Sequence, residues 1–302
     1  MKYLQILRYV DAVARVGSIR KAAETLALTS TALNRQILAM EHELGYPIFE
    51  RFSKGVRLSA EGSILIKHIR TQLTDLERVK GEIAELGGER RGHVSIACSQ
   101  AMLSHFLPVQ ISKYRKNHPG VTFEVLLRDR AAAEVALADM TADIGIVFEP
   151  VRFSEFQVLH CAQQTIHAVM RNDHPLATKG VLRLKDCIQF PISLPKSPYG
   201  VRSLLEIAAH RLSIQLNPIV ESDSFDFLYH HAIAENIVTF QLPIGLPHQA
   251  AFPGSISIPL DKSDAPHGSI YIGQLKQRVL PVAAAKFTDQ IIEAFINSYD
   301  CR

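Results

Sequence analysis

Apolar residues recur at helical spacing in the first segments of the chain. In the first segment they fall at every third position: Leu4, Leu7, Val10 and Val13. This spacing predicts a helix that ends near Val16-Gly17. Ser18 then caps a second helix, "IRKAAETL", whose paired alanines are small enough for another helix to cross it closely. We therefore expect the chain to begin with a small, mainly helical domain.

A third segment has an apolar face and a polar edge. The apolar positions expected to point inward are Leu33, Ile37, Met40 and Leu44. The residues left outside lie near the start of this helix: Ser30, Thr31, Asn34 and Arg35. Such a helix pair is typical of a helix-turn-helix, in which the second helix presents its first residues to base edges in the major groove. Arginine suits guanine and asparagine suits adenine. A plain helical hairpin with a solvated face is the alternative.

Two short apolar runs around Ser-Lys-Gly follow, in "YPIFERFSKGVRLSAEG". Apolar runs separated by a tight turn predict a hairpin, or wing. The cations on or beside it are Arg51, Lys54 and Arg57, which we expect to contact the phosphate backbone. Residues 1–59 are thus predicted to be a winged helix-turn-helix, mainly α, that binds DNA.

A long helix is predicted next, from about Ala60 to Leu86, capped by Ser59. Its apolar residues follow a three-four spacing with one interruption: Ile66, Ile69, Leu73, Leu76 and Ile83. This seam is narrow for a buried helix and suits pairing with a second copy. We expect residues 60–87 to be a linker and dimerisation helix, because a helix-turn-helix reads two half-sites as a dimer. Packing only within its own chain is the alternative.

Beyond a glycine pair and a charge cluster at residues 87–92, strands and helices alternate. The first round is the strand "HVSIACS", a helix over 102–118, the strand "VTFEVLL", the helix "AAAEVALADM" and the strand "DIGIVF". A second round begins near "QTIHAVMRND", and a final helix covers 281–299. This alternation predicts mostly parallel sheets covered by helices. We expect an α/β domain over 88–302 with two lobes, about 92–161 with 268–302 and about 162–267, and a cleft between them.

The formal net charge of +3 is unevenly distributed. Residues 1–59 hold nine Lys and Arg against five Asp and Glu, whereas the remaining chain holds 24 against 25. A basic segment joined to a neutral body favours a polyanion-binding head. Hydrophobic residues make up 47% and charged residues 21%, as in an ordinary globular protein, and no apolar run is long enough to span a membrane. Charges interrupt the N-terminal apolar segment, so we expect a cytoplasmic protein without membrane association.

Several motifs in the first 65 residues resemble the LysR-type transcriptional regulators. A leucine-initiated helix is followed by "GS", "AA..L", "NRQI..ME..LG", "IFER" and "V.LS..G". The resemblance implies a transcription regulator, not an enzyme, that binds double-stranded promoter DNA as a dimer or as a tetramer of two dimers and acts on RNA polymerase. The family commonly has Gln and Ser where this chain has Ser30 and Asn34, whereas Arg35 and Ile37 are retained. The base preference is therefore left open.

The second part of the chain also resembles, more loosely, the LysR effector domain, which is similar to periplasmic binding proteins. The matching motifs are "HPLA", "LP...Y...HP.V" and "L.D". Loops after strands, together with helix N-termini, supply amides and hydroxyls for an anion. The candidate effector-binding residues are Ser99, Gln100, Ala101, Met102, Arg128, Phe148, Ser197, Tyr199 and Gln241. We expect a small, anionic effector and no cofactor. Asn236 stands where relatives commonly have glycine, and we expect the backbone turn to differ there.

Other chemistry finds little support in the sequence. The cysteines, Cys98, Cys161, Cys187 and Cys301, lack metal-like spacing. No phosphate-loop, dinucleotide, nucleophile-elbow or zinc-protease motif is present. The pair His230-His231 cannot converge on one helical face, so we expect packing or capping rather than metal binding. Two other functions stay open: a solute-binding protein with an incidental head, and a redox sensor that uses Cys98.

Overall fold

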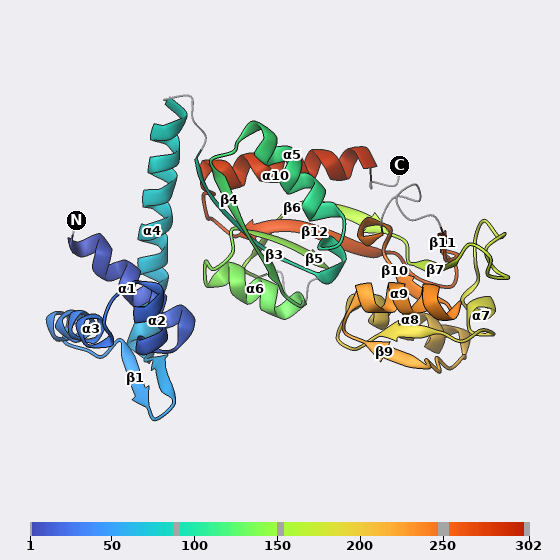
Figure 1. The fold of residues 1–302 in the computed structure, drawn as a ribbon, viewed down its shortest axis with the longest axis horizontal. Helices are drawn as coiled ribbons and strands as arrows, with labels where there is room; N and C mark the ends of the chain where they lie inside the picture. The colour runs from blue at the N-terminus through green and yellow to red at the C-terminus, as the bar shows by residue number, and fades with distance from the viewer. Residues whose placement is uncertain (1, 87–90, 150–153, 247–253, 299–302) are drawn as a thin grey trace. The chain divides into compact units, whose positions relative to one another are not determined.

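The computed structural model describes residues 2–86, 91–149, 154–246 and 254–298 (Figure 1). The chain forms two compact units, Met1–Gly88 and Glu89–Arg302, which are considered separately below.

The first unit consists of three helices, a hairpin and a long helix. Its elements are α1 (Lys2–Val16), α2 (Ile19–Thr25), α3 (Ser30–Leu44), β1 (Phe49–Phe52), β2 (Gly55–Leu58) and α4 (Ala60–Leu86). The predicted apolar faces form its core, which includes Leu7, Val10 and Val13 of α1 and Leu33 and Ile37 of α3. This is the winged helix-turn-helix expected from the spacing of the apolar residues.

Short polar residues and glycines set the ends of these elements. The Ser18 and Thr29 side chains accept hydrogen bonds from the backbone at the starts of α2 and α3. Ser59 Oγ accepts from Gly62 N (2.8 Å) and donates to Pro47 O (2.6 Å), which joins α4 to the loop before the wing. Val56 N donates to Gly17 O (2.9 Å), and a Cβ on Gly55 would lie 2.4 Å from that oxygen. Only glycine therefore allows the wing to reach the end of α1.

The two halves of α4 differ in their surroundings. Ile66 and Ile69 are buried in the core of their own unit, with Leu73 packed at its edge. Arg70 Nε also donates to Asp11 Oδ1 of α1 (2.7 Å). Ile66 and Ile69 are therefore unavailable for the predicted pairing, because spacing alone does not distinguish a dimer seam from a contact within one chain. Leu76 is half-buried, and Ile83 is 63% exposed.

The second unit contains a five-stranded sheet in the order β4-β3-β5-β12-β6. Its strands are β3 (Gly92–Cys98), β4 (Val121–Leu127), β5 (Ile144–Phe148), β6 (Phe156–Gln164) and β12 (Gly268–Leu275). Strands β4, β3, β5 and β6 run in one direction, whereas β12, which lies between β5 and β6, is antiparallel to both. The prediction of a mostly parallel sheet is thus correct for four of these five strands, and β12 alone among them is reversed because the chain returns there from the second lobe.

Helices cover both faces of this sheet (Figure 1). They are α5 (Phe106–Asn117), α6 (Arg130–Ala138) and α10 (Val282–Ser298). The α5 and α10 rings meet on one face, with Phe106 and Phe295 centroids 4.8 Å apart, and α6 packs its alanines on the other. The helix predicted to start at Met102 starts at Phe106, because residues 100–102 form a separate 3-10 turn, η1 (Gln100–Met102).

The second lobe is built on two smaller sheets. An antiparallel sheet has the order β10-β7-β11, with β7 (His167–Arg171), β10 (Thr239–Gln241) and β11 (Ser255–Pro259). The parallel pair β8 (Ser193–Pro195) and β9 (Val220–Ser222) lies with α7 (Leu184–Cys187), α8 (Gly200–Leu212), α9 (Phe225–Glu235) and η2 (Pro243–Gly245). Asn236 caps α9 at φ +53°. This is the left-handed conformation that glycine favours and asparagine tolerates, so asparagine at this position is compatible with the turn.

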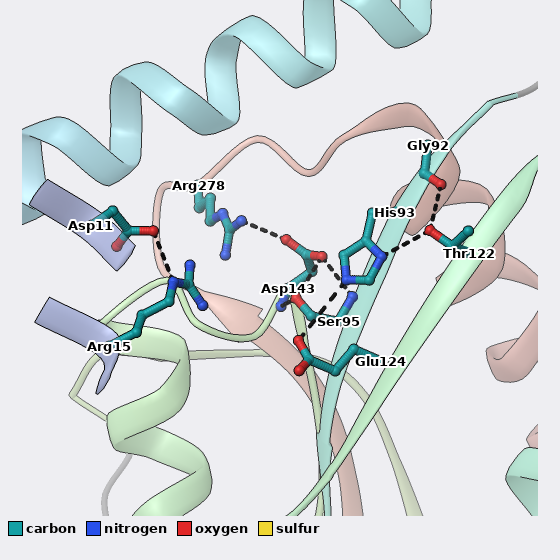
Figure 2. Close-up of polar contacts among 9 residues, drawn as sticks. All are labelled: Asp11, Arg15, Gly92, His93, Ser95, Thr122, Glu124, Asp143 and Arg278. Atoms are coloured by element: carbon teal, nitrogen blue, oxygen red, sulfur yellow. Dashed lines mark hydrogen bonds and ion pairs between the residues drawn. The ribbon is translucent and has the colours of Figure 1, made fainter. Parts of the chain in front are cut away.

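A buried ion pair ties the five-stranded sheet to the segment that follows β12 (Figure 2). Asp143 Oδ2 accepts from the backbone N–H and the hydroxyl of Ser95, both at 2.9 Å. Arg278 donates to Asp143 Oδ1 (2.5 Å) and to Ala142 O (2.8 Å). Both charged side chains are less than a tenth exposed. Their hydrogen bonds offset the cost of removing the charges from water.

Candidate nucleic-acid interface and ligand cavity

The N-terminal edge of α3 is polar and faces outward. Ser30, Thr31 and Arg35 are exposed and Asn34 is half-buried, whereas Leu33 between them is fully buried. Lys54 and Arg57 are exposed on the wing, and the Arg57 guanidinium lies 5.6 Å from the centre of the Phe52 ring. This surface can present donors and positive charge to a polyanion.

One cation of the wing is engaged with α3. Arg51 Nη1 donates to Asn34 Oδ1 at 2.9 Å, and Arg51 Nη2 lies 3.9 Å from Glu41 Oε2. Glu41 Oε1 in turn accepts from the backbone N–H groups of Ile48 (2.8 Å) and Phe49 (3.0 Å). The sequence indicated each of Asn34 and Arg51 as a DNA contact but not their contact with each other, because they lie 17 positions apart.

An apolar groove lies on the same unit, between α1, α3 and α4. Its lining residues are Tyr3, Ile6, Leu7, Gln36, Ala39, Met40, Glu43, Leu44, Leu65, His68 and Ile69. Ile64, which precedes Leu65 on α4, is 76% exposed, and Val79 further along the helix is 40% exposed. The outward face of α4 therefore keeps apolar side chains in water, and of the residues predicted from the seam Ile83 is among them, whereas Ile66 and Ile69 are not.

A cavity opens in the second unit where the ends of β3, β4 and β5 meet α8 and α9. It is lined by Ser99, Gln100, Ala101, Arg128, Asp129, Arg130, Phe148, Pro198, Tyr199, Gly200, Val201, Phe225 and Leu242. The predicted residues that it brings together are Ser99, Gln100, Ala101, Arg128, Phe148 and Tyr199. A Cβ on Gly268 would fall 1.9 Å from the Phe148 ring, so glycine makes room for this aromatic wall.

Three predicted residues do not line this cavity. Met102 is fully buried in the core, since the turn of η1 directs it inward. Ser197 is exposed, and the neighbouring Pro198 lines the cavity instead. Gln241 is buried and its Nε2 donates to Phe225 O (2.8 Å), and the next residue, Leu242, takes the predicted place. A displacement by one residue along a strand or loop turns the side chain away.

The polar groups of the cavity are partly satisfied by each other. Gln100 Nε2 donates to Asp223 O (2.7 Å) and its Oε1 accepts from Phe225 N (2.6 Å), so it joins the two lobes. Arg130, which was not among the predicted residues, donates to Pro198 O across the same gap (3.1 Å). Arg130 lies at the start of α6, two residues after Arg128, and this position in the sequence could have indicated that it lines the cavity.

Within the described part of the chain, Ser99 Oγ is buried and has no hydrogen-bond partner. Such a hydroxyl is costly unless a ligand or water satisfies it. Burial, followed by the charges of Asp223 and Asp129, raises the pKa of Tyr199 above its ordinary value, which already leaves the hydroxyl protonated at neutral pH. The cavity thus offers hydroxyl donors beside the side chains of Arg128 and Arg130.

The remaining candidate chemistry finds no site among the described residues. Cys98 is fully buried, and burial raises the pKa of its thiol to about 12, so the reactive thiolate is disfavoured. His231 lies against Phe227 and Glu235, and His230 against Tyr229, as expected for packing. Residues 2–86, 91–149, 154–246 and 254–298 hold no group of three potential metal ligands. No helix in these ranges is both long and apolar enough to cross a bilayer.

Comparisons with known proteins agree with these two parts. Residues 4–63 match the bacterial regulatory helix-turn-helix proteins of the lysR family, and residues 87–296 match the LysR substrate binding domain. The HTH-type transcriptional regulator CysB of Burkholderia cenocepacia is 26% identical over 253 residues, 82% of this chain and 79% of CysB.

Solved structures share the fold. A full-length OxyR variant from Pseudomonas aeruginosa has a TM-score of 0.73 at 19% identity, over 95% of this chain and 94% of that one. Full-length CbnR complexed with its target DNA has a TM-score of 0.62 at 18% identity, over 96% of this chain and 99% of CbnR. A helix-turn-helix unit and a two-lobed α/β unit with matching sequences over most of the chain place this protein in the LysR family of transcriptional regulators.

Proposed function

We propose that the protein binds specific promoter DNA as a homo-oligomer and that a small anion in the interlobe cavity regulates this binding. The observation that carries the regulatory part is the buried, unpartnered hydroxyl of Ser99 in a cavity lined by Arg128 and Arg130. An anion of a few atoms, such as a carboxylate, supplies the missing acceptor and pairs with a guanidinium. The protein then acts as a cytoplasmic regulator that communicates with RNA polymerase rather than as an enzyme.

The exposed edge of α3 and the basic wing support the DNA-binding part. In this proposal Ser30, Thr31, Asn34 and Arg35 meet base edges, and Lys54 and Arg57 hold phosphates. CbnR, which shares the fold, was solved with its target DNA. Binding that depends on phosphate contacts weakens steeply as salt rises.

The outward face of α4 supports self-association. Ile64, Val79 and Ile83 are exposed apolar side chains on one long helix, and the apolar groove begins beside Ile64. A second copy that covers this face removes the apolar side chains from water and supplies the second reading head. Sedimentation at decreasing concentration should show Val79→Asp dissociating before the wild type. The matched control is Val181→Asp, at a similarly exposed valine of the second unit.

Thermal unfolding of the full chain tests the effector part. The probes are a panel of small mono- and dicarboxylates, with inorganic phosphate and sulfate as separate arms. A ligand at about 100 times its Kd should raise the Tm by about 5 °C, because it binds only the folded protein. Ser99→Ala and Arg128→Met should reduce that shift. If no anion of the panel shifts the Tm, or if the variants respond like the wild type, the anionic effector is rejected.

A further inference from the structure

The contact between Asn34 and Arg51 determines which part of the Asn34 amide is presented to a ligand. The Arg51 guanidinium has only N–H donors, so the Asn34 atom it bonds, 2.9 Å away, must be the oxygen. The amide nitrogen, which has two donors and no acceptor, is then left for the DNA. This follows from the chemistry of the two side chains, because a guanidinium facing the amide nitrogen would oppose donor to donor.

The position of Arg51 is itself secured. Glu41, whose side chain is only 11% exposed, accepts two backbone N–H groups and lies 3.9 Å from the guanidinium. It therefore offers a fixed negative charge behind Arg51. We name these residues, Glu41, Arg51 and Asn34, the wing–helix cluster. It connects the start of the wing to the outer edge of α3 and prepares Asn34 before DNA arrives.

The bases differ in what they present to such an edge. Adenine shows an acceptor, N7, and a donor, its N6 amino group, which asparagine matches when its oxygen is available. Guanine shows two acceptors, N7 and O6. In the wing–helix cluster the Asn34 oxygen already accepts from Arg51, and a positive charge lies beside it. The oxygen keeps a second lone pair, but the guanidinium charge beside it makes the approach of a further donor less favourable, whereas the acceptors of guanine suit the free amide nitrogen.

We propose that Arg51 is a positioning residue that holds the Asn34 amide nitrogen outward, so that α3 selects guanine rather than adenine at the base pair that Asn34 meets. The proposal rests on the proposed DNA-binding function and deepens it. It also reassigns Arg51 from a phosphate contact, the role expected from the sequence, to one that acts through Asn34. Lys54 and Arg57 remain available for phosphates.

The test is selection of duplexes from a randomised library by the full-length protein at fixed salt, for the wild type and for Asn34→Ala, Arg51→Met and the double variant. The wild type should enrich guanine at one position of each half-site, and Asn34→Ala should lose that preference alone. Arg51→Met should move the preference at this position from guanine towards adenine by about 10-fold. On the selected guanine duplex, the double variant should bind no more weakly than the weaker single variant, because the two residues act together.

Lys54→Met is the matched control, since it removes an exposed cation of the same hairpin. It should weaken all duplexes alike and lower the salt dependence by about one phosphate contact. If Arg51→Met behaves like Lys54→Met and adds to Asn34→Ala, Arg51 is a phosphate contact and the proposal is wrong. If the protein enriches no duplex at all, the DNA-binding function itself fails. Far-UV circular dichroism and thermal unfolding of each variant verify that it folds.

Discussion

On the outer edge of α3 the side chains of Ser30, Thr31 and Arg35 are exposed to water and Asn34 bonds Arg51 of the wing, whereas in the cavity of the second unit the hydroxyl of Ser99 is buried and unpaired. The exposed side chains are hydrated in the free protein and contact DNA only in the complex. Substitutions there should therefore change the affinity for DNA and leave the free energy of unfolding nearly unchanged. The enclosed hydroxyl carries a cost in the empty protein that a ligand can remove. Removing an exposed polar side chain should therefore change mainly the affinity for the ligand, whereas removing a buried one should also change the free energy of unfolding.

The largest effect on folding is expected at the buried pair Asp143–Arg278. Asp143→Ala should lower the free energy of unfolding by about 3–5 kcal/mol, since it leaves a charge unpaired in the core. Denaturant titration of the full chain measures this loss. Glu24→Ala is the control: its partner Arg20 and Glu24 itself are largely exposed, and the change should be below about 1 kcal/mol. Equal losses for both variants would contradict the difference between buried and exposed charges.

The two halves of α4 provide a second contrast. Ile69→Ala should cost about 2–4 kcal/mol of unfolding free energy in the first unit, because it empties a fully buried site. Ile83→Ala should change this free energy by less than about 0.5 kcal/mol in the monomer, since its side chain is 63% exposed. Chemical unfolding at concentrations that favour the monomer separates the two. A large monomer effect at Ile83 would show that the outer half of α4 has a partner within its own chain.

A third prediction concerns binding at the exposed edge. Arg35→Ala should weaken binding to a selected duplex by about 1–3 kcal/mol, with thermal unfolding unchanged, because an exposed side chain that contacts a base contributes little to the fold. Gel-shift titration at fixed salt measures this. Arg20→Ala changes an arginine that is also exposed, on α2, and should bind like the wild type apart from a small electrostatic loss. Unchanged binding by Arg35→Ala would remove Arg35 from the interface.

The smallest effect is expected for Ser99 in the absence of ligand. Ser99→Ala should leave the unfolding free energy within about 1 kcal/mol of the wild type or raise it slightly, because an unsatisfied hydroxyl is removed from a buried place. Differential scanning calorimetry without added anions checks this. A loss of several kcal/mol would indicate a structural partner for the hydroxyl and would weaken the case for a ligand there.

Local signals in the sequence predicted the helix starts and most buried faces of the first unit. Ser18, Thr29 and Ser59 cap the helices as their residue types suggest, and the spacing of Leu7, Val10 and the residues of α3 marks the buried faces. These features depend on neighbours within a few positions. Partners far along the chain left no comparable signal, as for Ile66 and Ile69, which bury against α1 rather than against a second copy.

The residues that line the cavity could be predicted only in part from the sequence. The ends of β3, β4 and β5 pointed to Ser99, Arg128 and Phe148, because such ends gather at one edge of a sheet.

The strand β6 was not predicted, since "FQVLHCAQQ" mixes polar and apolar residues without the alternation of a half-buried strand. Gln241 and Leu242 exchanged roles for a related reason: register along a short strand is fixed by pairing with β7, which the sequence of β10 does not reveal.

The bridge made by Gln100 restricts what kind of molecule can part the lobes. Its amide gives a hydrogen to one backbone group of the far lobe and takes one from another, at Asp223 and Phe225. A monatomic ion that displaced this side chain would leave the two backbone groups without hydrogen-bond partners. A compound with a donor and an acceptor a few bonds apart would restore both hydrogen bonds. The hydrogen bonds of Gln100 therefore indicate the donor and acceptor that a ligand replacing this side chain would need.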